Sequence, residues 1–158
     1  MRPTFYYDTI ENPTRASGIL LWDFDQNLNQ IKFLMIFANG RYEDFGGKTD
    51  DEDENILETA CREMSEESNF ILKSDDLVID TKNCIYNKNS KYLIFLAKLN
   101  KITWKLDDFG DREEYENISR IVKWVTIEEF TELFQTNKLH IRLKIDNLIQ
   151  KILDIISL

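Results

Sequence analysis

The segment 46–70 carries a glycine pair, a run of acidic residues and then one apolar stripe at helical spacing. The stripe consists of Ile56, Leu57, Ala60, Cys61 and Met64. This period predicts an amphipathic helix over about residues 53–68, with one face in a core. The acids at 50–54 complement the positive end of the helix dipole and can cap its free amides. The glycine pair predicts either a positive φ or a close backbone approach.

Short apolar runs on both sides of this segment predict strands. Residues 17–24 and 31–37 are joined by turn formers, so they form a hairpin. Further strands are expected at 77–85, 92–99 and 118–125. A short helix is expected at 126–134, with Thr126 and Glu129 forming a capping box, and a C-terminal helix at about 141–156. The order predicts an α/β (α+β) fold, a mixed sheet with helices packed on it.

The composition is that of a globular chain, with 42% hydrophobic and 31% charged residues. Its 158 residues suit one domain, 1–158, that can bury a core without a disulfide or a metal. With 20 basic and 29 acidic side chains, the net charge of -9 excludes an even basic coating for gripping nucleic acid.

No apolar run approaches the roughly 20 residues that a bilayer crossing needs, so we expect no membrane partner. The N-terminus shows no apolar signal segment. Cys61 and Cys84 form no CxxC pair, which favours reduced thiols and a cytoplasmic location. His140 is the single histidine of the sequence, so a histidine-based metal site or catalytic triad is not expected.

Three glutamates of the predicted helix, Glu63, Glu66 and Glu67, fall on one face within one turn. Like charges this close repel unless a cation lies among them, and Mg²⁺ prefers such oxygen ligands. Glu67 also lies at the edge of the apolar stripe, where an unpartnered carboxylate is costly. The alternative is a solvated acidic face. The glycine pair, the arginine next to Glu63 and the position of Glu67 weigh against it.

These residues resemble the signature of the Nudix hydrolases, G-x5-E-x7-R-E-U-x-E-E-x-G-U, in which U is apolar. Glu54 and Arg62 have the seven intervening residues of that signature, and residues 62–67 match R-E-U-x-E-E without a gap. The likeness extends over about residues 15–135.

Two positions depart from the signature. Six residues separate Gly47 from Glu54 instead of five, so we expect one extra loop residue within 50–53. Asn69 stands where the signature has glycine. Asparagine tolerates a left-handed backbone better than other residues with a side chain, so the turn is expected to survive.

The resemblance implies a Nudix-like α/β/α sandwich that hydrolyses a diphosphate linkage in a nucleoside diphosphate derivative. It implies Mg²⁺, with Mn²⁺ as the alternative, to neutralise phosphate oxygens and to orient or activate a water. The implied metal ligands are Glu63, Glu66, Glu67 and the carbonyl of Gly46. The residues implied to support the loop and helix are Gly47, Glu54 and Arg62.

The general base is the least constrained part of the resemblance. It is expected in the acidic loop 111–116, where Glu116 is favoured over Glu114 and a merely solvated loop is the alternative. Candidate substrate contacts are Arg15, Lys48, Tyr42 and Phe45. For the two cations the alternative is an exposed surface position, and for the two aromatic residues it is the core.

Residues 138–144 are locally basic on an acidic chain, and they either steer RNA or form the polar side of the last helix. Three functions remain open: a pyrophosphohydrolase of small nucleotides, an mRNA decapping-type enzyme acting on capped RNA, and a catalytically silent Nudix-fold binding module. The expected partner is a small phosphorylated molecule, and a homodimer is one of the open oligomeric states.

Overall fold

The computed structural model describes residues 1–157. Its strands are β1 (Phe5–Tyr6), β2 (Pro13–Thr14), β3 (Ala16–Asp25), β4 (Gln30–Ala38), β5 (Arg41–Glu43), β6 (Phe45–Lys48), β7 (Leu77–Ile79), β8 (Ile85–Asn87), β9 (Tyr92–Leu99), β10 (Arg112–Glu113), β11 (Ile118–Ser119) and β12 (Ile121–Thr126). Its α-helices are α1 (Ile56–Glu67), α2 (Ile127–Gln135) and α3 (Leu148–Ile156). Single 3-10 turns occupy η1 (Ser74–Asp76), η2 (Leu106–Phe109) and η3 (Ile141–Leu143).

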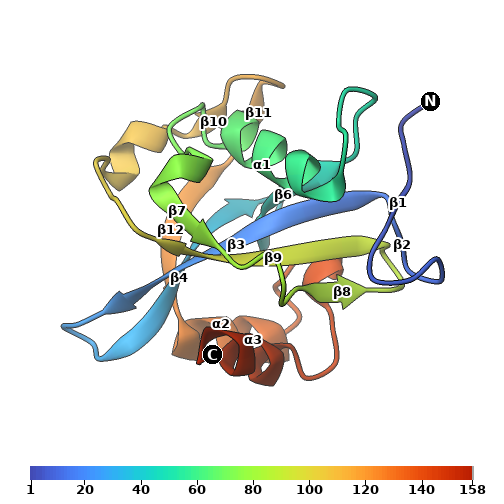
Figure 1. The fold of residues 1–158 in the computed structure, drawn as a ribbon. Coiled ribbons are helices and arrows are strands. Elements are labelled where there is room, and N and C mark those ends of the chain that lie inside the picture. The colour runs from blue at the N-terminus through green and yellow to red at the C-terminus, as the bar shows by residue number, and fades with distance from the viewer. Residues whose placement is uncertain (158) are drawn as a thin grey trace.

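The central layer is a mixed sheet with the strand order β12-β4-β3-β9-β7. β3 and β9 run parallel, whereas β4 is antiparallel to both β3 and β12. β5, β6 and β8 extend the sheet by pairing with β4, β3 and β9. Figure 1 shows α1 on one face of this sheet and α2 with α3 on the other. The expected α/β/α sandwich with a mixed sheet is therefore confirmed.

Helices on both faces explain why the central strands are continuous apolar runs rather than alternating ones. In β3, Ile19 and Leu21 join the core under α1, whereas Leu20 joins the core under α2 and α3. β9 divides in the same way, with Phe95 on the α1 side and Ile94 on the other. The expected hairpin of the first two long strands, β3 and β4, is confirmed.

The predicted helix of the signature begins later than expected, at Ile56. The side chain of Asn55 accepts the Glu58 amide and caps it, so the acids before Asn55 lie in a loop instead of the first turn. The second predicted helix has the expected cap, because Thr126 and Glu129 form a capping box at the start of α2.

Two predicted strands are each divided. The run at 77–85 is broken because Asp80 accepts the amides of Lys82 and Asn83, which turns the chain between β7 and β8. The run at 118–125 is interrupted at Arg120, whose side chain is buried, so β11 belongs to a separate hairpin with β10.

The C-terminal helix expected at about 141–156 begins instead at Leu148. η3 is only one turn, and Asn147 has a left-handed φ of 59° before the helix starts. Leu143 and Ile145 nevertheless stay buried in the same core as α3. Their apolar spacing therefore reflects burial in that core rather than a continuous helix.

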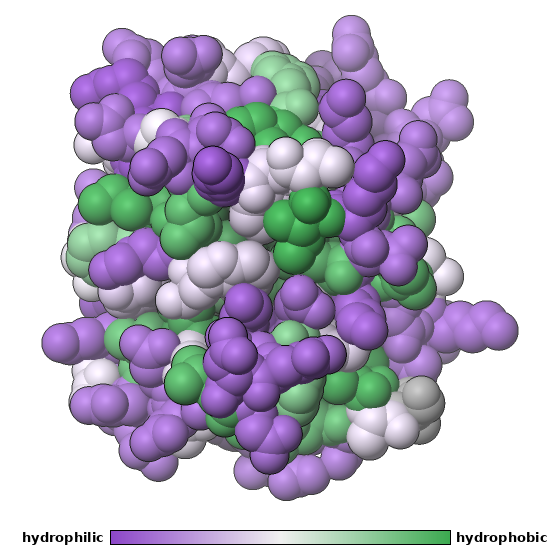
Figure 2. Space-filling view, turned by 90° about the vertical axis from the view of Figure 1, so that its left-hand side faces the viewer, coloured by the Kyte–Doolittle hydropathy of each residue, from purple (hydrophilic) through white to green (hydrophobic). Residues whose placement is uncertain are grey.

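The exterior is largely hydrophilic on the face drawn in Figure 2, with small apolar patches among charged side chains. No helix within residues 1–157 has the length and apolar character needed to cross a bilayer.

Candidate active site

The glycine pair lies in β6, where two close approaches require it. A Cβ on Gly46 would come 2.6 Å from the Cα of Gly18, the residue of β3 that pairs with Gly46. A Cβ on Gly47 would come 2.5 Å from a carboxylate oxygen of Glu63. Neither glycine has a positive φ, so the close-approach alternative holds. The absence of side chains here lets α1 press its glutamates against the strand.

Glu67 lies at the C-terminal end of α1, and its side chain turns back onto β6. One carboxylate oxygen, Oε1, accepts the Gly46 amide at 2.6 Å. The second oxygen remains available to the cavity that Glu67 lines. The sequence placed Glu67 at the edge of the core stripe, and the Gly46 amide supplies the partner that this position needs.

Arg62 connects the loop before α1 with the glutamates on it. Its guanidinium bonds to Asp53 at 3.0 Å and to the carbonyl of Lys48 at 2.8 Å. It also contacts Glu63 at 3.1 Å and Glu66 at 3.3 Å. The predicted supporting role of Arg62 therefore agrees with its contacts.

Asp53, not Glu54, is the acid that holds Arg62. Glu54 is exposed, whereas Asp53 is buried and also accepts the Thr59 hydroxyl at 2.7 Å. Burial raises the pKa of Asp53, but hydrogen bonds from Arg62 and Thr59 outweigh it and leave the pKa below its usual value. Five residues separate Gly47 from Asp53, so the spacing of the signature is kept with aspartate and the extra residue falls after it.

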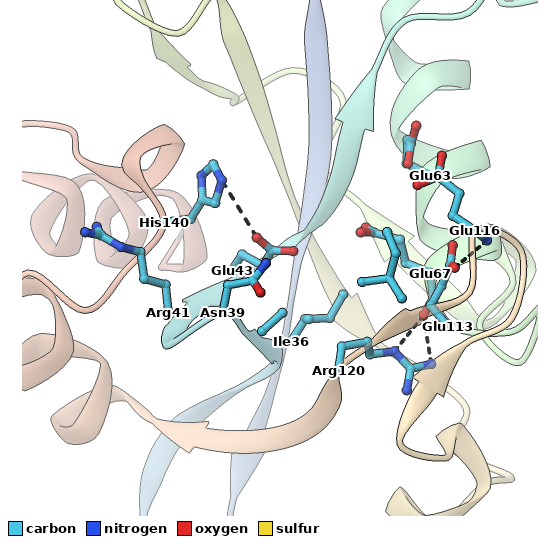
Figure 3. Close-up of a pocket in the computed structure, with 12 residues that line it drawn as sticks. Ile36, Asn39, Arg41, Glu43, Glu63, Glu67, Glu113, Glu116, Arg120 and His140 are labelled. Carbon is cyan, nitrogen blue, oxygen red and sulfur yellow. Dashed lines mark hydrogen bonds and ion pairs between the residues drawn. The ribbon is translucent and has the colours of Figure 1, made fainter.

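A second acidic element reaches the same place from the β10–β11 hairpin. Glu113 is buried, and its carboxylate accepts the Glu116 amide at 2.6 Å. Arg120 joins this hairpin to the helix, since it donates to the carbonyls of Glu67 and Gly110. Glu116, the favoured candidate for the general base, therefore lies beside Glu63 in the lining of one cavity (Figure 3).

These elements enclose a cavity of about 380 Å³. Its carboxylate wall consists of Glu63, Glu67, Glu113 and Glu116. Its opposite wall holds Glu43, Arg41 and His140 (Figure 3). The sequence did not indicate Glu43, and it placed Glu113 within the acidic loop 111–116 without favouring it. Strands far apart in the chain bring these two residues to one cavity.

Two carboxyls of this cavity, Glu63 and Glu67, have raised pKa values. Burial raises the pKa of Glu63 to about 7, with the neighbouring Glu66 and Glu116 adding to the rise against Arg62. Burial also raises the pKa of Glu67 well above its usual value, and Glu43 and Glu63 add to this. Negative charge is therefore concentrated beyond what the nearby arginines neutralise.

Behind the opposite wall lies a buried ion pair. Arg142 donates to the Asp44 carboxylate at 2.8 Å and to the Asp44 carbonyl at 2.7 Å. Tyr92 donates to the other Asp44 oxygen at 2.6 Å, and its ring lies under the guanidinium. This cluster ties the C-terminal segment to the strand that leads into Gly46.

The four predicted substrate contacts lie outside the lining of this cavity. Phe45 is fully buried in the core, so its prediction is wrong and the core alternative holds. Tyr42 packs on Phe37, with ring centroids 4.7 Å apart. Arg15 donates to Thr4 and to backbone carbonyls of the N-terminal segment, and Lys48 is exposed.

The basic segment 138–144 is not one charged surface. Arg142 is buried against Asp44, and His140 is half-buried beside Glu43. Burial and Arg142 lower the pKa of His140, so its ring is neutral near pH 7. The segment therefore contributes to the structure of the site, and nothing in it adds support for RNA binding.

Within residues 1–157, no three histidine, cysteine or acidic side chains are already grouped as metal ligands. The donor set nevertheless fits Mg²⁺, because the groups available are carboxylate oxygens and Mg²⁺ prefers oxygen. Arg62 holds Glu63 and Glu66, and Gly46 holds one oxygen of Glu67, so each has an oriented carboxylate.

No protein-family model and no curated protein matches this sequence. A crystal structure of C. elegans Ap4A hydrolase in a binary complex is 20% identical, with a TM-score of 0.63 over 91% of this chain and 98% of that one. The NUDIX domain of Shewanella oneidensis NrtR, solved with ADP ribose, is 15% identical, with a TM-score of 0.55 over 90% and 88%. A mutT/nudix family protein from Listeria innocua is 16% identical, with a TM-score of 0.52 over 90% and 92%. The chain therefore has the fold of the Nudix hydrolases.

Proposed function

We propose that this protein is a Mg²⁺-dependent hydrolase that cleaves a diphosphate linkage in a nucleoside diphosphate derivative. The observation that carries the proposal is the convergence of Glu63, Glu67 and Glu116 on one cavity from two separate elements. Glutamates with raised pKa values, pressed together beside a glycine strand, are costly for stability alone. Such a cost is expected at a functional site.

Glu63, Glu66 and Glu67 would hold the metal, with the Gly46 carbonyl as a further donor. When bound, Mg²⁺ supplies charge neutralisation for phosphate oxygens and makes water a better nucleophile. Arg62 fixes two of these carboxylates and Gly46 fixes the third, so little reorganisation is needed on binding.

Glu116 is our candidate for the general base. It lies in the carboxylate wall beside Glu63, on a hairpin separate from α1, so carboxylates from two different elements can reach one water. In that position its carboxylate would take the proton that the water loses as it attacks phosphorus. Glu114 lies outside the cavity lining, which supports the predicted order of the two candidates.

The opposite wall would receive the part of the substrate beyond the diphosphate. Arg41 offers a cation there, and His140 offers a neutral ring. The Nδ1 of His140 accepts the Arg142 amide at 3.1 Å, which assigns the ring proton to Nε2 on the side of Glu43. This wall therefore adds the cation of Arg41 and the Nε2–H of His140 to the carboxylate of Glu43.

The test is cleavage of a mixed panel in the presence of Mg²⁺ or Mn²⁺, with products identified by mass spectrometry. The panel contains nucleoside triphosphates, dinucleoside polyphosphates, ADP-ribose, NADH, diphosphoinositol phosphates and capped RNA. We expect one class to be cleaved at a diphosphate and Glu67→Gln to abolish the cleavage. Glu58→Gln is the matched control, because Glu58 lies on the same helix but is exposed.

A catalytically silent binding module is the second candidate. The similarity to the NrtR NUDIX domain, solved with ADP ribose, favours it, since that complex concerns binding. A folded wild type that binds a panel member and cleaves none, with either metal, would establish this second candidate. Cleavage of capped RNA alone would establish the decapping alternative.

A further inference from the structure

The hairpin that carries Glu116 has too few internal backbone pairs to fix its own position. We name residues 110–117 the Glu116 loop. The two strands of the hairpin, β10 and β11, share only two register pairs, and such a short hairpin is marginal on its own. Its position relative to α1 must therefore come from contacts outside the hairpin.

Asn69 supplies a set of these contacts. Its side-chain Nδ2 donates to the carbonyls of Phe109 and Arg112, at 3.0 and 2.9 Å. Its Oδ1 accepts the Glu114 amide at 2.8 Å. Both hydrogens and the oxygen of one amide are thus spent on backbone groups about 40 residues away in sequence.

The end of the helix does not require these bonds. The turn needs a residue with positive φ, and Asn69 has a φ of 54°, which glycine would adopt more easily. The backbone amide of Asn69 already donates to Glu66. The side chain is therefore free of any capping duty, and its three bonds serve the loop.

Arg120 holds the same two elements from the other side of the loop. It donates to the Glu67 carbonyl at 3.0 Å and to the Gly110 carbonyl at 2.9 Å. Asn69 and Arg120 thus join the C-terminal end of α1 to the first half of the Glu116 loop. Between them, the Glu113 carboxylate accepts the Glu116 amide.

We propose that Asn69 is a positioning residue that holds the Glu116 loop against the end of α1, so that Glu116 lies beside Glu63 in the carboxylate wall of the cavity. The catalytic consequence rests on the proposed function, whereas the hold on the loop does not. The departure from glycine in the signature is, in this protein, a clamp between the two carboxylate-bearing elements.

Asn69→Gly is the decisive variant, because glycine keeps the left-handed turn and removes only the three side-chain bonds. Asn69→Asp is the complementary variant. It keeps an acceptor for Glu114 but replaces two donors with an oxygen that faces two carbonyls. Asn137→Gly is the matched control, since Asn137 follows α2 with a φ of 61° and is exposed.

The hold is measured first, by hydrogen exchange of the substrate-free protein. Asn69→Gly and Asn69→Asp should both speed exchange of the Glu114 amide, while Asn137→Gly should not. This measurement needs no substrate, so it decides the clamp even if the wild type cleaves nothing. Unchanged exchange at Glu114 in both Asn69 variants would overturn the inference and leave the proposed function standing.

The catalytic consequence is measured as a split between kcat and KM on the substrate that the panel identifies. Asn69→Gly should lower kcat by about 10- to 100-fold with little change in KM, because the misplaced group acts in the chemical step. When Glu116 is already replaced by glutamine, Asn69→Gly should lower kcat by less than about twofold further. Two results would contradict the positioning role of Asn69. One is that Asn69→Gly lowers kcat by the same factor with and without Glu116→Gln. The other is an unchanged kcat in Asn69→Gly despite faster exchange of the Glu114 amide.

Discussion

The two faces of the sheet differ in the kinds of side chain that lie on them. On the α1 face, an apolar core lies between the helix and the sheet, and glutamates and arginines line the cavity beside it. On the α2 and α3 face, Leu148 and Ile152 pack into an apolar core whose members include Tyr92, the tyrosine that donates to Asp44. One face therefore carries charge that costs stability, and the other supplies packing that offsets this cost.

The largest expected effect lies on the α1 face. Glu67→Gln removes a carboxylate of the proposed metal site and several kcal/mol of charge stabilisation with it, so kcat/KM should fall about 10²–10⁴-fold. The same substitution should not destabilise the metal-free protein, because it removes a buried charge. A steady-state assay and a thermal melt in EDTA measure the two halves. A drop in melting temperature large enough to account for the lost activity would mean that Glu67 is only structural.

The next effect tests the link between the two faces. Arg142→Leu leaves the Asp44 carboxylate buried without its cation and should cost about 3–5 kcal/mol of the free energy of unfolding. Adding Asp44→Asn should recover part of this, because it removes the uncompensated charge while keeping an acceptor for Tyr92. Chemical denaturation of both variants measures the difference. A loss in the single variant no larger than in the double would show that the pair is not coupled.

A purely apolar change should separate the faces cleanly. Ile152→Ala empties a fully buried position on α3 and should cost about 2–5 kcal/mol of stability. At a temperature where the variant is folded, its KM and kcat should match the wild type, since α3 contributes nothing to the cavity lining. A change in KM would show that packing under α3 reaches the site through the Arg142 cluster.

The same contrast explains what the sequence could and could not predict. The α1 glutamates were predictable, because helical spacing and the signature place them on one face before any tertiary contact is known. Asp53 in place of Glu54 was not, since two acids stand side by side and only the folded loop shows which one meets Arg62.

Contacts between distant segments left no local signal. Glu43 reaches the cavity through strand pairing, and Asn69 reaches the Glu116 loop across about 40 residues, whereas the acidic run at 111–116 indicated the loop of Glu113 but not its burial. On the other face, the apolar period of 141–156 indicated burial correctly but the wrong helix start. Periodicity reports which side chains are buried, and it does not distinguish one helix from a 3-10 turn followed by a helix.

The smallest effect concerns pH, and its clearest contributor is Glu63 on the α1 face. The pKa of Glu63 is raised to about 7 in the folded protein from a usual value of 4.5. Below about pH 4.5 the carboxyl is protonated whether the chain is folded or not. Between these values the folded state binds a proton that the unfolded state has lost, so stability must fall as pH rises through this window.

Thermal melts of the metal-free protein from pH 4.5 to 7.5 measure this fall. Glu63→Gln should reduce the fall, with the remainder due to groups such as Glu67 whose pKa is also raised, whereas Glu132→Gln, an exposed change on α2, should leave it unchanged. Asp53 acts in the opposite sense, because its lowered pKa protects the fold until the pH drops below about 4. Mg²⁺ should also flatten the fall, since a bound cation favours the ionised carboxylates that burial opposes. A melting temperature that rises with pH across this window would contradict the crowding of carboxylates on which the proposed chemistry depends.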